Sequence, residues 1–186
     1  MSDQPNTGNG AATPGNQAAG QATDANRPNA LPIAINAQYV KDLSFESPNA
    51  PQALLPNQPQ PQVAVSVDVR PQQLADNVYE VALNLRAEAT AGDRTYFIVE
   101  LTYGGLFTLQ GVPKEHLSPV LMIEAPRLLF PFARAIVAEA TRDGGFPPLM
   151  INPIDFAELF RRQVAQAQQK QGQPDRKAEP EGGASA

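Results

Sequence analysis

Apolar and polar side chains alternate through residues 39–108, and this alternation constrains the fold more than any other feature of the sequence. Four segments show it, separated by turn-forming residues and rich in Val, Tyr, Phe, Thr and Leu: 39–45, 63–70, 78–88 and 94–108. Successive side chains of a β-strand point to opposite faces, so each segment predicts a strand. Residues 91–93 are few enough to connect a hairpin, which favours an antiparallel sheet.

The two faces of this predicted sheet differ in polarity. Odd-numbered positions are strongly apolar, from Tyr39 in the first segment to Tyr103 in the last. Even-numbered positions carry most of the charge: Asp42, Glu46, Asp68, Glu80, Glu88 and Glu100, with Arg70, Arg86 and Arg94 between them. We expect one covered face and one exposed face on which the carboxylates gather.

Proline and turn residues mark the breaks between these segments. Five prolines lie in 47–62, so this segment is predicted to be a non-helical crossover. Residues 71–77 begin with a proline and are predicted to be a tight connection.

The second half of the sequence predicts helices. Residues 114–124 and 127–142 are interrupted by Pro126 and Pro131, so we expect a bend or a restart there. Apolar side chains recur at helical spacing, and Gly144 and Gly145 end the pattern. The predicted stripe consists of Leu128, Leu129, Phe132, Ile136, Val137 and Ala140.

A further helix is predicted after residue 152. Asn152 is a suitable N-cap and Pro153 a suitable first helical residue. Its apolar stripe is Phe156, Leu159, Phe160 and Val164. Strands followed by helices indicate an α+β fold, a four-stranded antiparallel sheet with helices packed on one face.

Both ends of the chain lack the apolar side chains that a core requires. Residues 1–30 contain no Val, Ile, Leu, Phe, Tyr or Trp, and 163–186 contain only Val164 from that set. We expect a disordered tail at 1–30, one domain at 31–162, and a helix end followed by a disordered tail at 163–186. No apolar run approaches the roughly 18 residues that span a bilayer, and no secretory signal is visible, which predicts a cytoplasmic protein without membrane insertion.

The net charge is concentrated in one part of the domain. The chain carries −5, and residues 31–100 hold eight acids against four bases. Nucleic acid is disfavoured as a partner because no cluster of Lys and Arg is present to bind phosphates. The carboxylate-rich face is either a solvated surface or a docking surface for a basic partner.

The sequence contains no constellation typical of an enzyme. It has no cysteine, and its one histidine, His116, has no nucleophile motif to accompany it. The glycine pairs at 104–105 and 144–145 lack the spacing of a phosphate-binding loop and are interpreted as a strand bulge and a helix C-cap. We expect no catalytic residue, metal site or cofactor.

Two features suggest polypeptide binding. The predicted helical residues 121–123 and 128–130 are apolar on both sides of the helix. This is more apolar surface than one thin sheet and two helices can cover in a monomer, which favours oligomerisation. The crossover is flanked by Phe45, Leu54 and Leu55 and would leave an apolar groove for an extended peptide, unless it is an ordinary surface loop.

Five collinear motifs resemble the SecB family of bacterial protein-export chaperones. Residues 39–51, Tyr-Val-Lys-Asp-Leu-Ser-Phe-Glu-Ser-Pro-Asn-Ala-Pro, are similar to its opening signature. The others are Val-Tyr-Glu-Val at 78–81, Tyr-Gly-Gly-Leu-Phe at 103–107, Leu-Phe-Pro-Phe-Ala-Arg at 129–134, and Gly-Phe-Pro-Pro-Leu at 145–149 leading into Pro-Ile-Asp-Phe at 153–156.

This resemblance implies a homotetramer, built as a dimer of dimers with helices between outward-facing sheets. The family has no enzymatic activity and uses no nucleotide. It implies a chaperone that holds precursor proteins unfolded and passes them to the SecA translocation ATPase.

The resemblance also implies roles for individual positions. The SecA-binding positions are Asp42, Glu46, Ile98 and Glu100, and the positions that affect the oligomer interface are Val99, Leu101 and Tyr103. The groove predicted above supplies Phe45, Leu54 and Leu55 as precursor-binding residues.

Two hypotheses follow. The first is an ATP-independent export chaperone, and the alternative is a sheet-based binder of small apolar ligands in the same groove. A tetramer would favour the first, and a ligand-bearing monomer the second.

Overall fold

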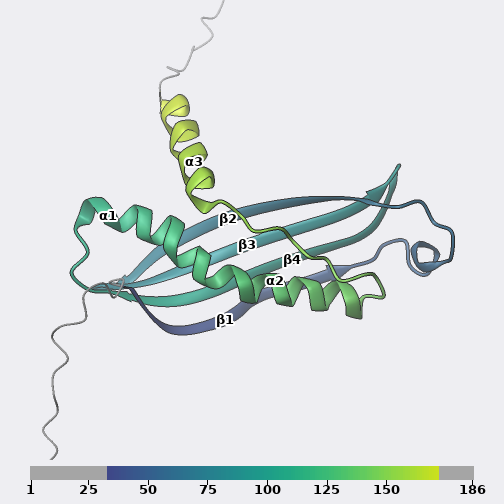
Figure 1. Cartoon of the computed structure of the whole chain (residues 1–186), viewed down its shortest axis with the longest axis horizontal. Coiled ribbons are helices and arrows are strands. Elements are labelled where there is room, and N and C mark those ends of the chain that lie inside the picture. The colour runs from purple at the N-terminus through teal and green to yellow at the C-terminus, as the bar shows by residue number, and fades with distance from the viewer. Residues whose placement is uncertain (1–32, 172–186) are drawn as a thin grey trace, which may run out of the picture. The chain divides into compact units, whose positions relative to one another are not determined.

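Four antiparallel strands form one sheet in the computed structural model, which describes residues 33–171 (Figure 1). The strands are β1 (Ile33–Glu46), β2 (Gln62–Ala75), β3 (Val78–Ala91) and β4 (Arg94–Leu109). Their order across the sheet is β1-β4-β3-β2, so β1 and β2 are the edges. All four predicted strands and the α+β class are confirmed, whereas the tail predicted at 1–30 lies outside the described residues.

The alternation of the two central strands is confirmed in register and burial. Leu83 of β3 lies opposite both Val69 of β2 and Tyr103 of β4, and odd-numbered residues pair with odd-numbered residues throughout most of the sheet. Leu83 and Phe107 are fully buried. We call the side that carries these residues the helix face and the opposite side, which carries Glu100 and Arg86, the polar face.

The connection predicted at 71–77 is wrong, because β2 continues through Pro71 to Ala75. Only Asp76 and Asn77 connect it to β3, and Asn77 has a φ of 59°. Pro71 lies opposite Val81. Proline is tolerated in this strand because an edge strand needs hydrogen bonds on one side only.

A continuous helical segment covers the helix face (Figure 1). It comprises α1 (Lys114–Pro119), the π-helical turn η2 (Val120–Glu124) and α2 (Ala125–Asp143). The predicted irregularity takes the form of this π turn directly before Pro126, a common site of helix distortion. The helix continues through Pro131 without a restart.

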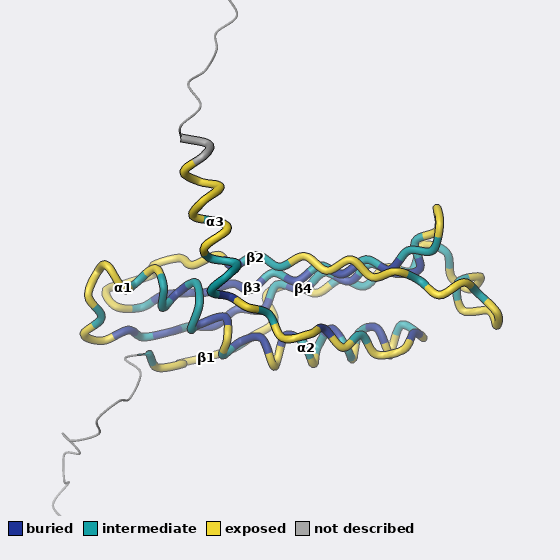
Figure 2. The backbone as a smooth tube through the Cα atoms, turned by 45° about the horizontal axis from the view of Figure 1, so that its top comes forward, coloured by how far each residue is buried: buried dark blue, intermediate teal, exposed yellow. Residues whose placement is uncertain are grey.

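The predicted apolar stripe of α2 is covered by the sheet except at Phe132. Leu129, Ala133 and Val137 are buried against the sheet, whereas the side chain of Phe132 is 52% exposed. Figure 2 shows the same division as buried and exposed turns along α2. Phe132 is therefore the one member of the predicted stripe that is exposed, while Leu128, Ile136 and Ala140 are partly buried against the core.

Two shorter segments correct the predictions made for them. The crossover contains one turn of 3-10 helix, η1 (Gln52–Leu54), although it was predicted to be non-helical. Helix α3 (Phe156–Gln171) begins four residues after the predicted cap, because Asp155 Oδ1 accepts a hydrogen bond from the Glu158 backbone N–H at 3.0 Å. The part of the predicted C-terminal tail beyond residue 171 lies outside the described residues.

Candidate functional site

Two β-bulges in β1 change which side chains reach the polar face. Asn36 and Lys41 are the extra residues, and between them Tyr39 lies opposite Gly104 while Val40 lies opposite Tyr103. A bulge inserts one residue and so reverses the alternation. Tyr39 therefore lies on the polar face, and its predicted place among the covered odd-numbered residues is wrong.

The glycine pair of β4 accommodates packing on both faces of the sheet. A Cβ at Gly104 would lie 2.7 Å from Cε2 of Tyr39, and a Cβ at Gly105 would lie 2.7 Å from Cδ2 of Leu129 in α2. The predicted strand bulge at 104–105 is wrong, because β4 keeps its register with β3 there and the nearby bulges belong to β1. The C-cap interpretation of Gly144 is confirmed.

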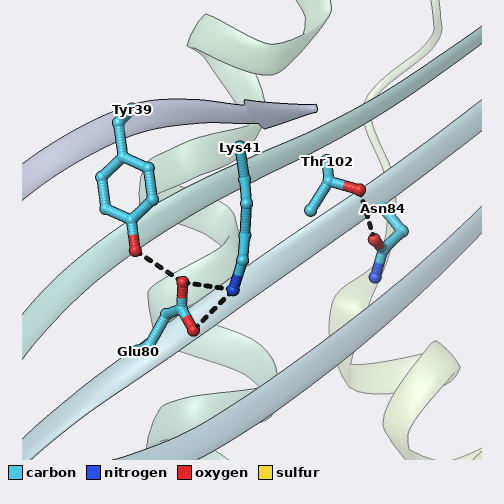
Figure 3. A network of polar contacts seen from close by, with 5 residues as sticks. All are labelled: Tyr39, Lys41, Glu80, Asn84 and Thr102. Atoms are coloured by element: carbon cyan, nitrogen blue, oxygen red, sulfur yellow. Dashed lines mark hydrogen bonds and ion pairs between the residues drawn. The ribbon is translucent and has the colours of Figure 1, made fainter. Parts of the chain in front are cut away.

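A buried carboxylate on the polar face holds two side chains of β1 (Figure 3). Tyr39 Oη donates to Glu80 Oε1 at 2.5 Å, and Lys41 Nζ donates to both Glu80 oxygens at 2.9 Å. Glu80 is only 7% exposed. The hydrogen bonds from Tyr39 and Lys41 hold the pKa of the Glu80 carboxyl below its usual value, and the bond to Glu80 together with burial raises the pKa of Tyr39 to about 12.

The remaining charges of the polar face are paired unevenly. Arg70 Nε lies 2.7 Å from Asp68 Oδ2, and Arg86 bonds both Glu88 and Glu100. Asp42 and Glu46 form no ion pair within residues 33–168. The carboxylates of this face that have no ion pair within residues 33–168 therefore lie on β1.

The four predicted docking positions lie on this same face. Glu46 is directly opposite Ile98 across the β1–β4 pair, and Asp42 is opposite Thr102. Glu100 lies between Ile98 and Thr102 on β4 and is opposite Arg86 of β3. The sheet thus brings Asp42, Glu46, Ile98 and Glu100 onto two adjacent strands.

An apolar groove of about 600 Å³ lies on the helix face beside the crossover. Leu54 and Leu55 line it and are 44% and 56% exposed. Aromatic residues that the prediction missed form its wall: Tyr96, Phe97 and Phe146. Phe45 does not line the groove but packs against two of these rings, with its ring centroid 5.9 Å from that of Phe97 and 6.3 Å from that of Phe146.

Alternation alone could not predict that Tyr96 faces the groove. The pairing of β3 with β4 shifts between Ala89 and Thr90, and this shift puts the Tyr96 side chain on the same face as its odd-numbered neighbours. Its hydroxyl donates to the Pro59 carbonyl at 3.0 Å and holds the crossover over the sheet. Asn49 Nδ2 donates to the Thr95 carbonyl at 2.8 Å and adds a second attachment. Ser47 Oγ donates to the Tyr96 carbonyl at 2.9 Å, so the crossover is tied to β4 at three points.

The three positions assigned to the oligomer interface lie in the core of the single chain. Val99, Leu101 and Tyr103 are 1%, 2% and 7% exposed, on the face that α2 covers. They are not available as a contact surface in this chain. Any influence on assembly would pass through the packing of α2.

The described residues contain no group of His, Cys, Asp or Glu side chains that could hold a metal ion. His116 is exposed in α1. No helix in the described part of the chain is long and apolar enough to cross a membrane.

Comparison with known proteins decides the family. The model of the SecB family, described as preprotein translocase subunit SecB, matches residues 26–167. The chain belongs to the SecB family. This is a family of non-enzymatic chaperones, in agreement with the prediction that the chain is not an enzyme.

Relatives with the name protein-export protein SecB are closely similar in sequence. The SecB protein of Rhodospirillum centenum is 61% identical over 135 residues, which cover 72% of this chain and 80% of the relative. That of a Bradyrhizobium species is 52% identical over 140 residues, covering 75% of this chain and 86% of the relative.

A solved structure shares the fold. The SecB-like chaperone of Mycobacterium tuberculosis, in complex with a ChAD peptide from an antitoxin, superposes with a TM-score of 0.53 at 14% identity. The match covers 66% of this chain and 87% of that one.

The Glu80 network gives a stability that depends on pH. The folded-state pKa of Glu80 is depressed, so the ionised carboxylate stabilises the fold above its unfolded pKa, and this contribution is lost as the pH falls through the folded pKa. Glu80→Gln should cost about 1–3 kcal/mol of unfolding free energy at pH 7, a typical value for hydrogen bonds to a charged group. Urea unfolding at pH 7 and at a series of acidic pH values measures the difference.

The difference between wild type and Glu80→Gln should shrink as the pH falls below the ordinary carboxyl range. Glu139→Gln, on the exposed side of α2, is the matched control and should remain close to wild type throughout. A deficit for Glu80→Gln that stays constant down to the acid transition would contradict the assigned role of the carboxylate.

Proposed function

We propose that this chain is an ATP-independent chaperone that keeps newly made precursor proteins unfolded and delivers them to the SecA translocation ATPase. The observation that supports it most is the division of one sheet into two surfaces, an apolar groove on the helix face and an acidic patch on the polar face. Membership of the SecB family supplies the class of function. The chain would act in the cytoplasm, where precursors await export.

The groove fits an extended apolar segment of a precursor. Its lining combines leucine side chains from the crossover with aromatic rings from β4, and it continues onto Val63 at the start of β2. β2 is an edge strand, whose backbone groups on the outer side are open to pairing with an added strand. The Mycobacterium tuberculosis relative with this fold was solved with a peptide bound.

The acidic patch fits a basic surface of SecA. We assign Asp42, Glu46, Ile98 and Glu100 as its docking positions. Asp42 and Glu46 have no cation partner within residues 33–168, so their charge is available to a docking protein. Ile98, which lies on β4 opposite Glu46, would add an apolar contact to the docking partner.

A homotetramer, organised as a dimer of dimers, would cover the apolar surface that a single chain exposes. On the helix face of β1, Ile35, Val40 and Leu43 are 40%, 46% and 44% exposed, and Phe132 of α2 is 52% exposed. Exposed apolar surface of this kind marks an interaction site. Val99, Leu101 and Tyr103 would influence assembly by setting the position of α2 on the sheet.

Chaperone activity should depend on the groove and not on ATP. At a stoichiometric ratio and without nucleotide, the wild-type chain should slow the aggregation of an unfolded precursor, measured by light scattering. The Leu54→Ser/Leu55→Ser variant should lose several-fold of this effect because two exposed apolar contacts are removed.

Leu74→Ser is the matched control, because Leu74 is 53% exposed on β2 but does not line the groove. It should protect the precursor as wild type does. If the wild-type chain did not slow aggregation, the proposed function would be contradicted. If Leu74→Ser lost as much protection as Leu54→Ser/Leu55→Ser, the assignment of the groove would be contradicted.

Docking to SecA should be separable from precursor binding. Asp42→Lys and Glu100→Lys should each weaken SecA binding by at least several-fold, because a positive charge replaces a negative one on the docking face, and added salt should weaken the wild-type interaction. Calorimetry with SecA and fluorescence binding of a precursor peptide measure the two activities.

Both charge-reversal variants should bind the precursor peptide normally, since the groove lies on the opposite face. Glu139→Lys on α2 is the control for charge reversal away from the polar face. Equal loss of SecA and precursor binding in the Asp42 variant would contradict the separation of the two surfaces.

A further inference from the structure

A trough of about 570 Å³ on the polar face brings Lys41 and Asp42 together. Consecutive residues of a regular strand point to opposite faces, but Lys41 is the extra residue of a β-bulge. Both side chains therefore line the same trough, together with Glu80. A lysine and an aspartate so placed would be expected to neutralise each other.

Each cation that lines this trough or the hollow beside it is held by another carboxylate. Lys41 bonds both oxygens of Glu80, and Arg70 bonds Asp68. Arg86, in the adjoining hollow, bonds Glu88 and Glu100. Asp42 lines both hollows and has no cation partner within residues 33–168.

The Lys41–Glu80 pair is less exposed than the Arg70–Asp68 pair, with side-chain exposures of 50% for Lys41 and 9% for Glu80. Glu80 as a whole residue is 7% exposed and holds Lys41 Nζ with both of its carboxylate oxygens, each at 2.9 Å. The side chains of Arg70 and Asp68 are 76% and 43% exposed, and exposed pairs of this kind exchange readily with water. Lys41 is also the cation adjacent to Asp42 in the chain.

We infer that Glu80 is a positioning residue that withholds Lys41 from Asp42, so that the Asp42 carboxylate remains available to a basic side chain of the docking partner. The inference rests on the proposed function, in which this face binds SecA. Glu80 itself is too buried to contact the partner and acts through Lys41. Loss of its carboxylate would leave Lys41 as an internal competitor for Asp42.

The test measures SecA binding by calorimetry for a set of variants of the full chain. Glu80→Gln should weaken binding several-fold, close to the effect of Asp42→Asn. Removing the released cation in Glu80→Gln/Lys41→Met should restore most of the affinity, which a merely structural role of Glu80 would not do. Glu80→Gln/Asp42→Asn should bind no more weakly than Asp42→Asn alone, because both act through the same carboxylate.

Two controls separate the competing explanations. Tyr39→Phe removes a hydrogen bond to Glu80 but leaves Lys41 held, so its SecA affinity should remain near wild type even where its stability falls. Asp76→Asn removes one negative charge in the β2–β3 turn, where no ion pair is formed with other described residues, and should weaken binding less than Glu80→Gln.

Precursor binding by each variant verifies that it folds, and Glu80→Met provides a second variant that releases Lys41.

Three results would overturn the inference while leaving the proposed function intact: wild-type SecA affinity in a folded Glu80→Gln or Glu80→Met variant, no rescue by Lys41→Met, or an equal loss in Asp76→Asn. Wild-type affinity in Asp42→Asn would overturn the docking surface itself.

Discussion

The helix face of the sheet is covered along its central strands by α2, whereas the polar face of the described chain is largely open and is contacted by α3 at Asp68, through Gln163. The rest of the molecule depends on this asymmetry. Leu129, Ala133 and Val137 of α2 pack on the odd-numbered side chains of β3 and β4, and burial of that apolar layer holds the helical segment in place. Gly105 permits the approach, because any side chain there would occupy the space of Leu129.

The two proposed binding surfaces share strands but not faces. In β1, Phe45 packs toward the aromatic wall of the groove, while its neighbour Glu46 lies opposite Ile98 on the polar face. Alternation along a strand thus places the apolar groove and the proposed docking positions on opposite faces of the sheet. The β1 bulges modify this plan locally and bring Tyr39 and Lys41 to the buried carboxylate of Glu80.

Alternation and the SecB-like motifs predicted the four strands, the covered face and the shared face of Asp42, Glu46, Ile98 and Glu100. They failed at Tyr39 and Tyr96, because a single inserted residue reverses the alternation and no residue type marks where it occurs. The start of α3 was also misplaced. Asn152 and Asp155 are both good caps, and the edge-to-face contact of Phe156 with Phe130 favours the later start.

If precursor and SecA bind opposite faces of one sheet, as proposed, the two should bind the same chaperone at the same time. The measurement is the affinity of SecA for the chaperone alone and for the chaperone saturated with an unfolded polypeptide that SecA does not itself bind. A ternary complex with nearly unchanged SecA affinity is the predicted result. Displacement of the polypeptide by SecA at matched concentrations would contradict the account.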